Sequence, residues 1–217
     1  MTNKPAAQAK TKSSLREYTE AILIALALAL LIRTFIIQAF KIPSGSMKNT
    51  LLVGDHILVS KFSYGVHIPN EIPFTGYKLF DDRTLFQGVP ERNDIIVFKY
   101  PKNEKRDFIK RVIGLPGETI ELRRQKVYIN NKLLEEPFAI HTEPPGDFLV
   151  PRDDLGPLRI PEEHVFVMGD NRENSQDGRY WGFLDVRKIR GKAQMIYWSW
   201  NKEDNWIRFG RLGDLIE

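Results

Sequence analysis

The sequence predicts a mostly β domain preceded by a single apolar helix, and three observations lead to this fold class. Twelve apolar residues follow one another from Ala21 to Ile32, in the only long apolar run of the chain. After residue 40 the chain consists of short segments that are rich in β-branched residues and bounded by turns, without a helical period of useful length. Hydrophobic residues make up 42% of the 217 residues, which indicates a folded core.

The apolar run is interpreted as an uncleaved membrane anchor. It continues past Arg33 to Ile37, which gives seventeen residues and about 25 Å of helix. The alternative is a cleavable secretion signal, but the best candidate cleavage site, at 37–39, has Ile where a small residue is required.

The charges before the run predict its orientation. Residues 1–16 contain no acidic residue and four basic ones, Lys4, Lys10, Lys12 and Arg16. Because basic flanks stay in the cytoplasm, we expect a cytoplasmic tail over residues 1–17. A transmembrane helix over residues 18–38 and an extracytoplasmic domain over residues 39–217 follow from this orientation.

The extracytoplasmic part is predicted to be built from short strands. The segments with strand character are 56–62, 94–100, 107–114, 119–124, 127–134, 164–170 and 188–200. Within 127–134, the pair Asn130-Asn131 fits a two-residue hairpin turn, since Asn tolerates positive φ. Residues 63–93 and 135–162 are rich in Pro and are interpreted as long excursions, and a β insertion is expected around 125–162.

Charge and cysteine content exclude several classes of protein. The 32 basic and 28 acidic residues give a net charge of +4 without a long basic block, whereas nucleic-acid binding requires a clustered basic face. The absence of cysteine excludes a disulfide scaffold, a thiol nucleophile and a thiolate metal site. The four histidines are scattered without the spacing of ligands, and we predict neither a metal nor a cofactor.

Residues 40–47, FKIPSGSM, contain the first candidate catalytic residue, Ser46. A flexible linker is the alternative, but the apolar residues Phe40, Ile42 and Met47 have no use in a tether. Gly45 permits a tight turn on which Ser46 exposes its hydroxyl and N–H together. The nine residues from Ile37 to Ser46 span at most about 30 Å, so Ser46 is expected near the membrane surface.

A nucleophilic serine requires a base, and Lys110 is the candidate. On a strand Lys110 shares a face with Phe108 and Val112, so apolar neighbours disfavour its ammonium form and lower its pKa. The structural alternative is an edge-strand lysine that extends into water. A Ser-His-Asp triad is also open, although no histidine lies in a recognisable hydrolase context.

The polar stretch 168–182 is the third candidate segment. It contains Ser175, Asp177 and Arg179 at alternate positions, which suits a buried network with an ion pair between the last two. A surface turn is the alternative interpretation.

These segments resemble the type I signal peptidases (leader peptidases), membrane-anchored proteases with a Ser-Lys dyad. Five motifs occur in the order of the family, at 43–47, 54–59, 93–98, 110–118 and 169–182. The resemblance implies a β-barrel-like peptidase core with a small β insertion, preceded by one transmembrane helix.

By this resemblance Ser46 is the nucleophile and Lys110 the general base. The Ser46 N–H and the Ser44 hydroxyl are the implied oxyanion donors, and Ser175 orients the lysine, with Asp177 and Arg179 in support. The implied pockets for small substrate residues at −1 and −3 are lined by Phe40, Ile42, Ile57, Val97 and Ile109, for which simple packing is the alternative.

Two positions depart from the family pattern. Asn49 stands where the family commonly has Pro, and Gly178 stands where it often has Ser. Neither position supplies the nucleophile or the base, so the departures bear on local rigidity.

The expected function is the removal of signal peptides from exported preproteins at the outer, periplasmic face of the cytoplasmic (inner) membrane. Preproteins and membrane lipid are the expected partners, with no nucleic acid and no metal. The alternatives are a self-cleaving Ser-Lys repressor, which would carry a DNA-binding domain, and a non-catalytic tethered β module. An organellar inner-membrane peptidase would have the same chemistry.

Overall fold

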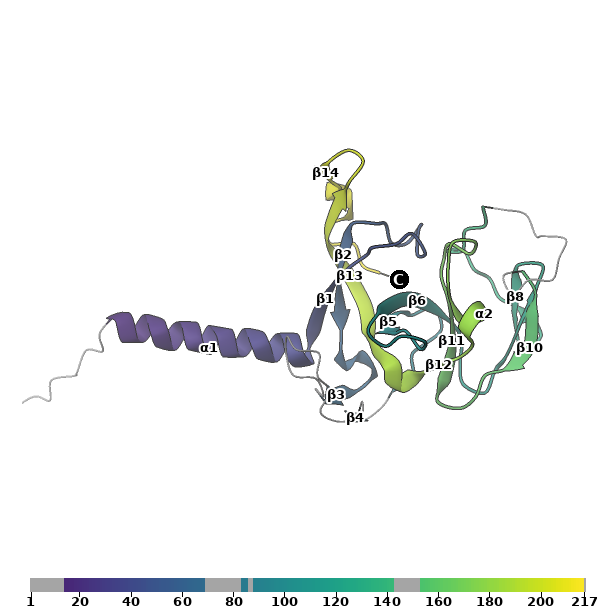
Figure 1. Cartoon of the computed structure of the whole chain (residues 1–217), viewed down its shortest axis with the longest axis horizontal. Helices are drawn as coiled ribbons and strands as arrows, with labels where there is room; N and C mark the ends of the chain where they lie inside the picture. Colours follow the sequence, from purple (N-terminus) through teal and green to yellow (C-terminus); the bar gives the residue numbers. More distant parts are fainter. Residues whose placement is uncertain (1–13, 69–82, 86–87, 143–152, 217) are drawn as a thin grey trace, which may run out of the picture.

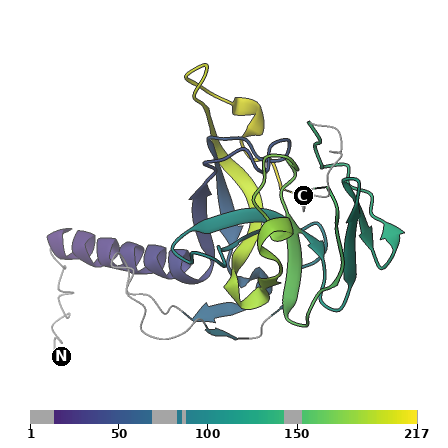
Figure 2. The same cartoon turned by 45° about the vertical axis from the view of Figure 1, so that its right-hand side comes forward.

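The computed structural model describes residues 14–68, 83–85, 88–142 and 153–216. It is mostly β, as predicted, with one long helix, α1 (Ser14–Phe35), that projects from the body in both views (Figures 1 and 2). The only other α-helix of the described ranges is a single turn, α2 (Gly178–Trp181).

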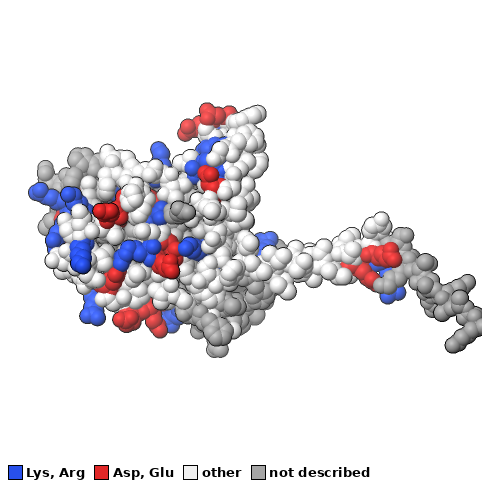
Figure 3. Space-filling view, turned by 180° about the vertical axis from the view of Figure 1, so that it is seen from behind, with Lys and Arg blue, Asp and Glu red and all other residues white. Residues whose placement is uncertain are grey.

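The apolar side chains of α1 are exposed on every side. Leu23 and Ile24 are 60% and 68% exposed, although successive residues point about 100° apart around a helix. Figure 3 shows the projecting helix as a largely uncharged surface, with its charges gathered near the N-terminal end. Within the described residues, no helix combines the length and the apolar character needed to cross a membrane.

Among the described residues, the main sheet has eight strands. Their order is β1-β2-β13-β5-β6-β11-β12, and β14 pairs separately with β13. Their bounds are β1 (Ile37–Lys41), β2 (Asp55–Ser60), β5 (Ile95–Lys99), β6 (Asp107–Gly114), β11 (His164–Met168), β12 (Leu184–Asp185), β13 (Ile189–Asn201) and β14 (Trp206–Ile207).

The sheet is open, and the expected closure into a barrel is not found among the described residues. The order has two ends, β1 and β12, which do not pair with each other. β12 has only two residues, and both pair with β11. The prediction of a mostly β body is therefore confirmed, whereas the closed barrel is not.

A second sheet carries the insertion. Its four strands run in the order β10-β7-β8-β9, with bounds β7 (Thr119–Arg123), β8 (Lys126–Ile129), β9 (Lys132–Leu133) and β10 (Leu155–Arg159). The hairpin turn between β8 and β9 has φ values of 50° at Asn130 and 65° at Asn131, as predicted for this pair. A small separate ladder joins β3 (Val66–Ile68) to β4 (Arg83–Leu85).

Several strands lie outside the segments that were predicted as strands. β1 begins at Ile37, inside the expected anchor 18–38, because it pairs with Ser60 of β2. β10 lies inside the expected β insertion, in its Pro-rich part, and Pro157 is tolerated because β10 is an edge strand that pairs only with β7. β3 and β4 lie in the first excursion, most of which falls outside the described residues.

Three apolar clusters form the core of the part that the structure describes. One lies beneath the turn that carries Ser46 and includes Met47 and Leu51. A second packs Ile96 and Val112 around the centre of β5 and β6. The third joins the two sheets, because Phe166 of β11 packs with the second sheet's apolar side chains. Each fully buried side chain of this size contributes roughly 1.5–3 kcal/mol to folding.

Candidate active site

The structure brings Ser46 and Lys110 together. The Lys110 Nζ donates a hydrogen bond to Ser46 Oγ at 2.8 Å and a second one to the Ile109 carbonyl oxygen at 2.8 Å. Ser46 lies in the turn after β1 and Lys110 in the middle of β6, and they are 7% and 3% exposed. Two residues that are 64 positions apart in the sequence thus form one hydrogen-bonded pair.

The surroundings of Lys110 favour its neutral form. Phe108 and Val112 lie on the same face of β6, and the ammonium is 5.4 Å from the centroid of the Phe108 ring. Burial lowers the pKa of Lys110 to about 8, although Asp177 and Asp170 partly oppose the shift. The alternative of an edge-strand lysine in water is therefore wrong, since Lys110 is buried and its strand pairs with β5 at Ile96.

The segment that carries Ser46 is a closed loop and not a linker. At its base the Ile42 N–H donates to the Asp55 carbonyl oxygen at 2.8 Å, and the Gly54 N–H donates to the Ile42 carbonyl oxygen at 3.0 Å. Gly54 has a φ of 96°, and a Cβ there would lie 2.1 Å from the Trp200 carbonyl oxygen. Only glycine can occupy this position without displacing the backbone.

Two ion pairs, one of them fully buried, hold this loop from two sides. On one side Arg111 makes two hydrogen bonds of 2.9 Å to Asp170, whose carboxylate also accepts from Thr50 Oγ1 at 2.6 Å. On the other side Arg211 bonds Asp55 at 2.7 Å and the Thr50 carbonyl oxygen at 2.9 Å. Thr50 therefore connects the two ion pairs, four residues after Ser46.

Asp177 and Arg179 form the buried ion pair that the sequence predicted. The Asp177 carboxylate accepts from Arg179 Nε at 2.8 Å, from Ser175 Oγ at 2.6 Å and from the Gly169 N–H at 3.0 Å. Burial raises the pKa of Asp177, but these hydrogen bonds and the Arg179 charge outweigh it and hold the pKa below its usual range. The interpretation as a surface turn is therefore wrong.

Ser175 lies beside the dyad without bonding to the lysine. Its hydroxyl donates to Asp177, and no hydrogen bond joins it to Lys110 in the part of the chain that the structure describes. A Cβ on Gly169 would lie 2.3 Å from Ser175 Oγ and 2.5 Å from the Ser46 carbonyl oxygen. Gly169 thus allows the polar loop to approach the Ser46 turn closely.

The remaining residues of the predicted site fall into two groups. Ser44 is exposed on the turn, and its hydroxyl makes no hydrogen bond to the described residues. The five residues assigned to the substrate pockets all belong to the cluster beneath the Ser46 turn: Phe40, Ile42, Ile57, Val97 and Ile109. They line this region, but each also serves as a packing residue.

The structure explains both departures from the family pattern. Asn49 has a φ of 93°, whereas proline requires a φ near −65° and cannot adopt this conformation. At Gly178, a Cβ would lie 3.0 Å from both Phe166 Cε2 and the Val167 carbonyl oxygen. A serine there would require Phe166 to shift.

Several residues around the dyad were missed by the sequence reasoning. Thr50 and Asp170 lie within or beside the quoted motifs, so the motifs were the available indication. Arg211 lies after the last motif, and no local pattern indicates its role. No three His, Cys, Asp or Glu side chains gather as a possible metal site in the described ranges.

The chain is similar to known proteins over most of its length. A family model described as signal peptidase, peptidase S26, matches residues 15–198. The signal peptidase I of Pseudomonas aeruginosa is 36% identical over 91% of this chain and 78% of its own length. That of Leptolyngbya laminosa is 36% identical over 96% of this chain and 89% of its own. A solved structure of a signal peptidase I from Enterococcus faecalis has 34% identity and a TM-score of 0.40, covering 48% of this chain and 95% of the other.

Proposed function

Because this chain belongs to the signal peptidase family of S26 peptidases, we propose how its residues carry out the reaction of that family. The protein is a serine endopeptidase that removes signal peptides from preproteins. We assign the nucleophile to Ser46 and the general base to Lys110. The observation that carries this assignment is the 2.8 Å hydrogen bond between Lys110 Nζ and Ser46 Oγ, deep within the body. The alternatives of a self-cleaving repressor and a non-catalytic module are set aside.

In the proposed reaction neutral Lys110 takes the proton of Ser46 Oγ as this oxygen attacks the scissile carbonyl carbon. The carbonyl oxygen becomes an oxyanion, to which the Ser46 N–H and the Ser44 hydroxyl donate. The C–N bond then breaks, and Lys110 gives its proton to the leaving amine. Water attacks the acyl-serine with Lys110 again as the base, which releases the signal peptide and regenerates Ser46.

Ser175, Asp177 and Arg179 act in this proposal as positioning residues. The Asp177 carboxylate accepts hydrogen bonds from the Ser175 hydroxyl and the Gly169 N–H, and Arg179 holds this carboxylate in place. These contacts hold the polar loop against the Ser46 turn. The Ser175 hydroxyl donates to Asp177, and its oxygen keeps lone pairs that accept from Lys110 Nζ once that group approaches it, so Ser175 can orient the lysine without losing Asp177.

We further propose that Phe40, Ile42, Ile57, Val97 and Ile109 shape shallow pockets for small substrate residues at −1 and −3. Their common cluster lies directly under the Ser46 turn, which supports this role. A pocket formed by tightly packed branched side chains admits alanine and rejects larger residues by steric exclusion.

The proposed setting is the outer, periplasmic side of the cytoplasmic (inner) membrane, with one anchor and a cytoplasmic N-terminus. The proposed division is a tail at 1–17, an anchor at 18–38 and a peptidase domain at 39–217 with a β insertion around 125–162. The exposed apolar side chains of α1 support lipid as a partner, because such a surface is costly in water. Neither nucleic acid nor metal enters the proposal.

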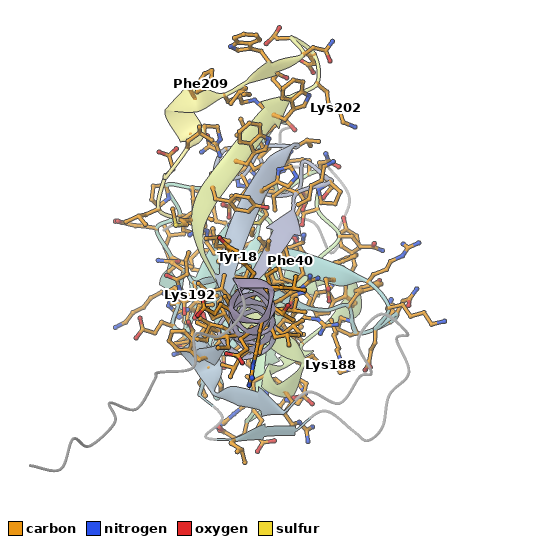
Figure 4. All side chains as sticks on the ribbon, turned by 90° about the vertical axis from the view of Figure 1, so that its left-hand side faces the viewer. Tyr18, Phe40, Lys188, Lys192, Lys202 and Phe209 are labelled. Carbon is orange, nitrogen blue, oxygen red and sulfur yellow. The ribbon has the colours of Figure 1, made fainter. Side chains whose placement is uncertain are left out.

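A second exposed apolar surface supports contact with lipid. Trp206 and Phe209 are 66% and 60% exposed near the end of the β13–β14 hairpin. In the view along α1, Phe209 and Lys202 lie at the far end of this hairpin, while Tyr18 lies on the helix (Figure 4). Aromatic residues accompanied by basic ones suit the interface between lipid and water.

The assignment is tested by Ser46→Ala and Lys110→Met in the full chain with detergent or lipid. Each removes one partner of the dyad, so cleavage of a preprotein is expected to disappear while the circular dichroism spectrum stays the same. Lys48→Met, which changes an exposed lysine in the same loop, is the matched control and is expected to keep its activity. Near-wild-type turnover by either dyad variant would show that the dyad is misassigned.

A further inference from the structure

Asn171 lies directly against the turn that carries Ser46. Its backbone N–H donates to the Ser46 carbonyl oxygen at 3.1 Å, and its side-chain Nδ2 donates to the Gly45 carbonyl oxygen at 3.1 Å. The two acceptors belong to the two peptide groups that flank Ser46. One residue thus restrains the backbone on both sides of the nucleophile.

The bond to Gly45 determines where the Ser46 N–H points. The Gly45 carbonyl and the Ser46 N–H belong to one planar peptide group, so fixing the oxygen on one side fixes the N–H on the other. Glycine leaves this peptide free to rotate, so an external restraint has an effect here. Hydrogen bonds to the carbonyl, from Asn171 and from the Lys48 N–H at 3.0 Å, also polarise the peptide and strengthen its N–H as a donor.

The Ser46 N–H is available for a substrate. It donates to none of the described residues, although its own carbonyl oxygen and that of Gly45 are both occupied. An oxyanion site requires a backbone donor that is free of other partners, and the Ser46 N–H meets this condition within the described residues.

The hydrogen bond from Nδ2 to the Gly45 carbonyl oxygen orients the side chain of Asn171. It is 7% exposed, and its Oδ1 is buried without a hydrogen-bond partner among the described residues. Leaving a buried carbonyl oxygen unpaired is unfavourable, and such exceptions require an explanation. Only the NH₂ group can donate to Gly45, so the amide gives up a bond at Oδ1 to keep the one at Nδ2.

We propose that Asn171 is a positioning residue that directs the Ser46 N–H toward the oxyanion of the transition state. This inference rests on the proposed function, in which that N–H is an oxyanion donor. Asn171 does not touch the reacting atoms and acts through the peptide between Gly45 and Ser46.

The test compares Asn171→Ala and Asn171→Asp with wild type, in the full chain with detergent. The substrate is a synthetic peptide that spans a signal-peptide cleavage site. The probe of the oxyanion site is the corresponding peptide aldehyde, whose carbonyl carbon bonds to Ser46 Oγ while its oxygen becomes the oxyanion.

For Asn171→Ala we expect kcat to fall on the order of tenfold, below the roughly 10²–10³-fold cost of losing an oxyanion donor outright. KM should stay near the wild-type value, and affinity for the aldehyde should fall by a factor similar to that of kcat. Asn171→Asp should be slower still, because a carboxylate cannot donate to Gly45 and repels the oxyanion. The acidic limb of the pH profile, set by Lys110, should not move.

Asn174→Ala is the matched control. Asn174 is exposed in the same loop, and its Nδ2 lies 3.7 Å from where a Cβ on Gly45 would stand, without a hydrogen bond to the turn. It should retain wild-type kcat and aldehyde affinity.

Two outcomes would overturn the inference. In the first, Asn171→Ala or the shape-preserving Asn171→Asp keeps full kcat and full aldehyde affinity. In the second, KM rises while kcat is unchanged, which would assign Asn171 to substrate binding. If the proposed function itself is wrong, the Ser46→Ala variant will still cleave the substrate. If Ser46→Ala is inactive while Asn171→Ala is fully active, only the positioning role of Asn171 is refuted.

Discussion

Lys110 and Arg111 are neighbours on β6 and are almost equally buried, at 3% and 2% exposed, yet their surroundings differ completely. Arg111 points to a carboxylate that receives two parallel hydrogen bonds, and its guanidinium carbon lies 4.0 Å from the centroid of the Phe138 ring. Lys110 points to a hydroxyl and a carbonyl oxygen and has no carboxylate within hydrogen-bonding distance among the described residues.

The difference shows that burial alone does not decide what a basic side chain can do. A buried cation that is paired keeps its charge and holds structure together, whereas one without a counter-ion loses its proton readily. Strand alternation gives one strand both kinds of residue, since adjacent side chains face opposite sides of the sheet. The predictions below separate the stability role of one face from the catalytic role of the other.

The largest effect on stability is expected from Arg111→Met. It leaves the buried Asp170 carboxylate without its partner, which should lower the free energy of unfolding by about 3–5 kcal/mol. Urea denaturation followed by fluorescence measures this. The double variant with Asp170→Leu should recover part of the loss, because no charge is then left unpaired. A single variant as stable as wild type would contradict the structural role of the pair.

The second prediction concerns pH. Since burial lowers the pKa of Lys110 to about 8, kcat/KM should rise with pH along an acidic limb near that value. Two pH units below the limb, the rate should be about 10²-fold lower, because each unit removes tenfold of the neutral amine. The pH dependence of kcat/KM on a peptide substrate is the measurement.

Phe108→Ala sharpens the pH test. It opens the surroundings of the ammonium to water, so the limb should move to higher pH. A limb that instead moves with His164→Gln and ignores Phe108→Ala would favour a histidine base and contradict the dyad.

A smaller effect on stability is expected from Arg211→Met, on the far side of the Ser46 loop. Loss of its bonds to Asp55 and to the Thr50 carbonyl oxygen should cost about 1.5–3 kcal/mol, the range of hydrogen bonds to charged groups. The matched control is Arg187→Met, which breaks an exposed pair with Asp185 and should cost no more than about 1 kcal/mol. Equal thermal denaturation midpoints for Arg211→Met and Arg187→Met would contradict the role of Arg211 in stabilising the Ser46 loop.

The smallest effect on stability is expected from Lys110→Met, which should abolish activity. The unfolded lysine binds its proton up to about 10.5 and the folded one only up to about 8, so wild-type stability should rise with pH in that window. A methionine side chain has no proton to lose, so the variant should lack this rise and be at least as stable as wild type at neutral pH. Urea denaturation at several pH values checks this, and marked destabilisation at neutral pH would contradict it.

The comparison also explains what the sequence could and could not predict. β6 was predicted with its observed ends because its β-branched residues and flanking turns indicate a strand from the local sequence alone. The dyad was predicted because each partner lies in a recognisable motif. β1 was missed because its first residues, Ile37 and Gln38, were assigned to the end of the apolar helix, and only the pairing with β2 makes this segment a strand.

Contacts over long sequence separations account for the rest. Arg211 and Asp55 are 156 positions apart, and no local pattern in the sequence indicates which arginine pairs with which aspartate. The open sheet was likewise not predictable, since the length of β12 is decided by its tertiary neighbours. Asn171 was read only as part of a motif, because its role depends on the orientation of a peptide group in another segment.

The length of β13 has a consequence for when the enzyme becomes competent. This strand pairs with β2 on one side and β5 on the other, and its Ser199 bonds Asp55 across 144 positions of sequence. Contacts of such separation form late, because a large loop must close before they contribute. The base of the Ser46 loop therefore cannot assemble until β13 has left the ribosome. We expect the nascent chain to have no protease activity during most of its own synthesis and export.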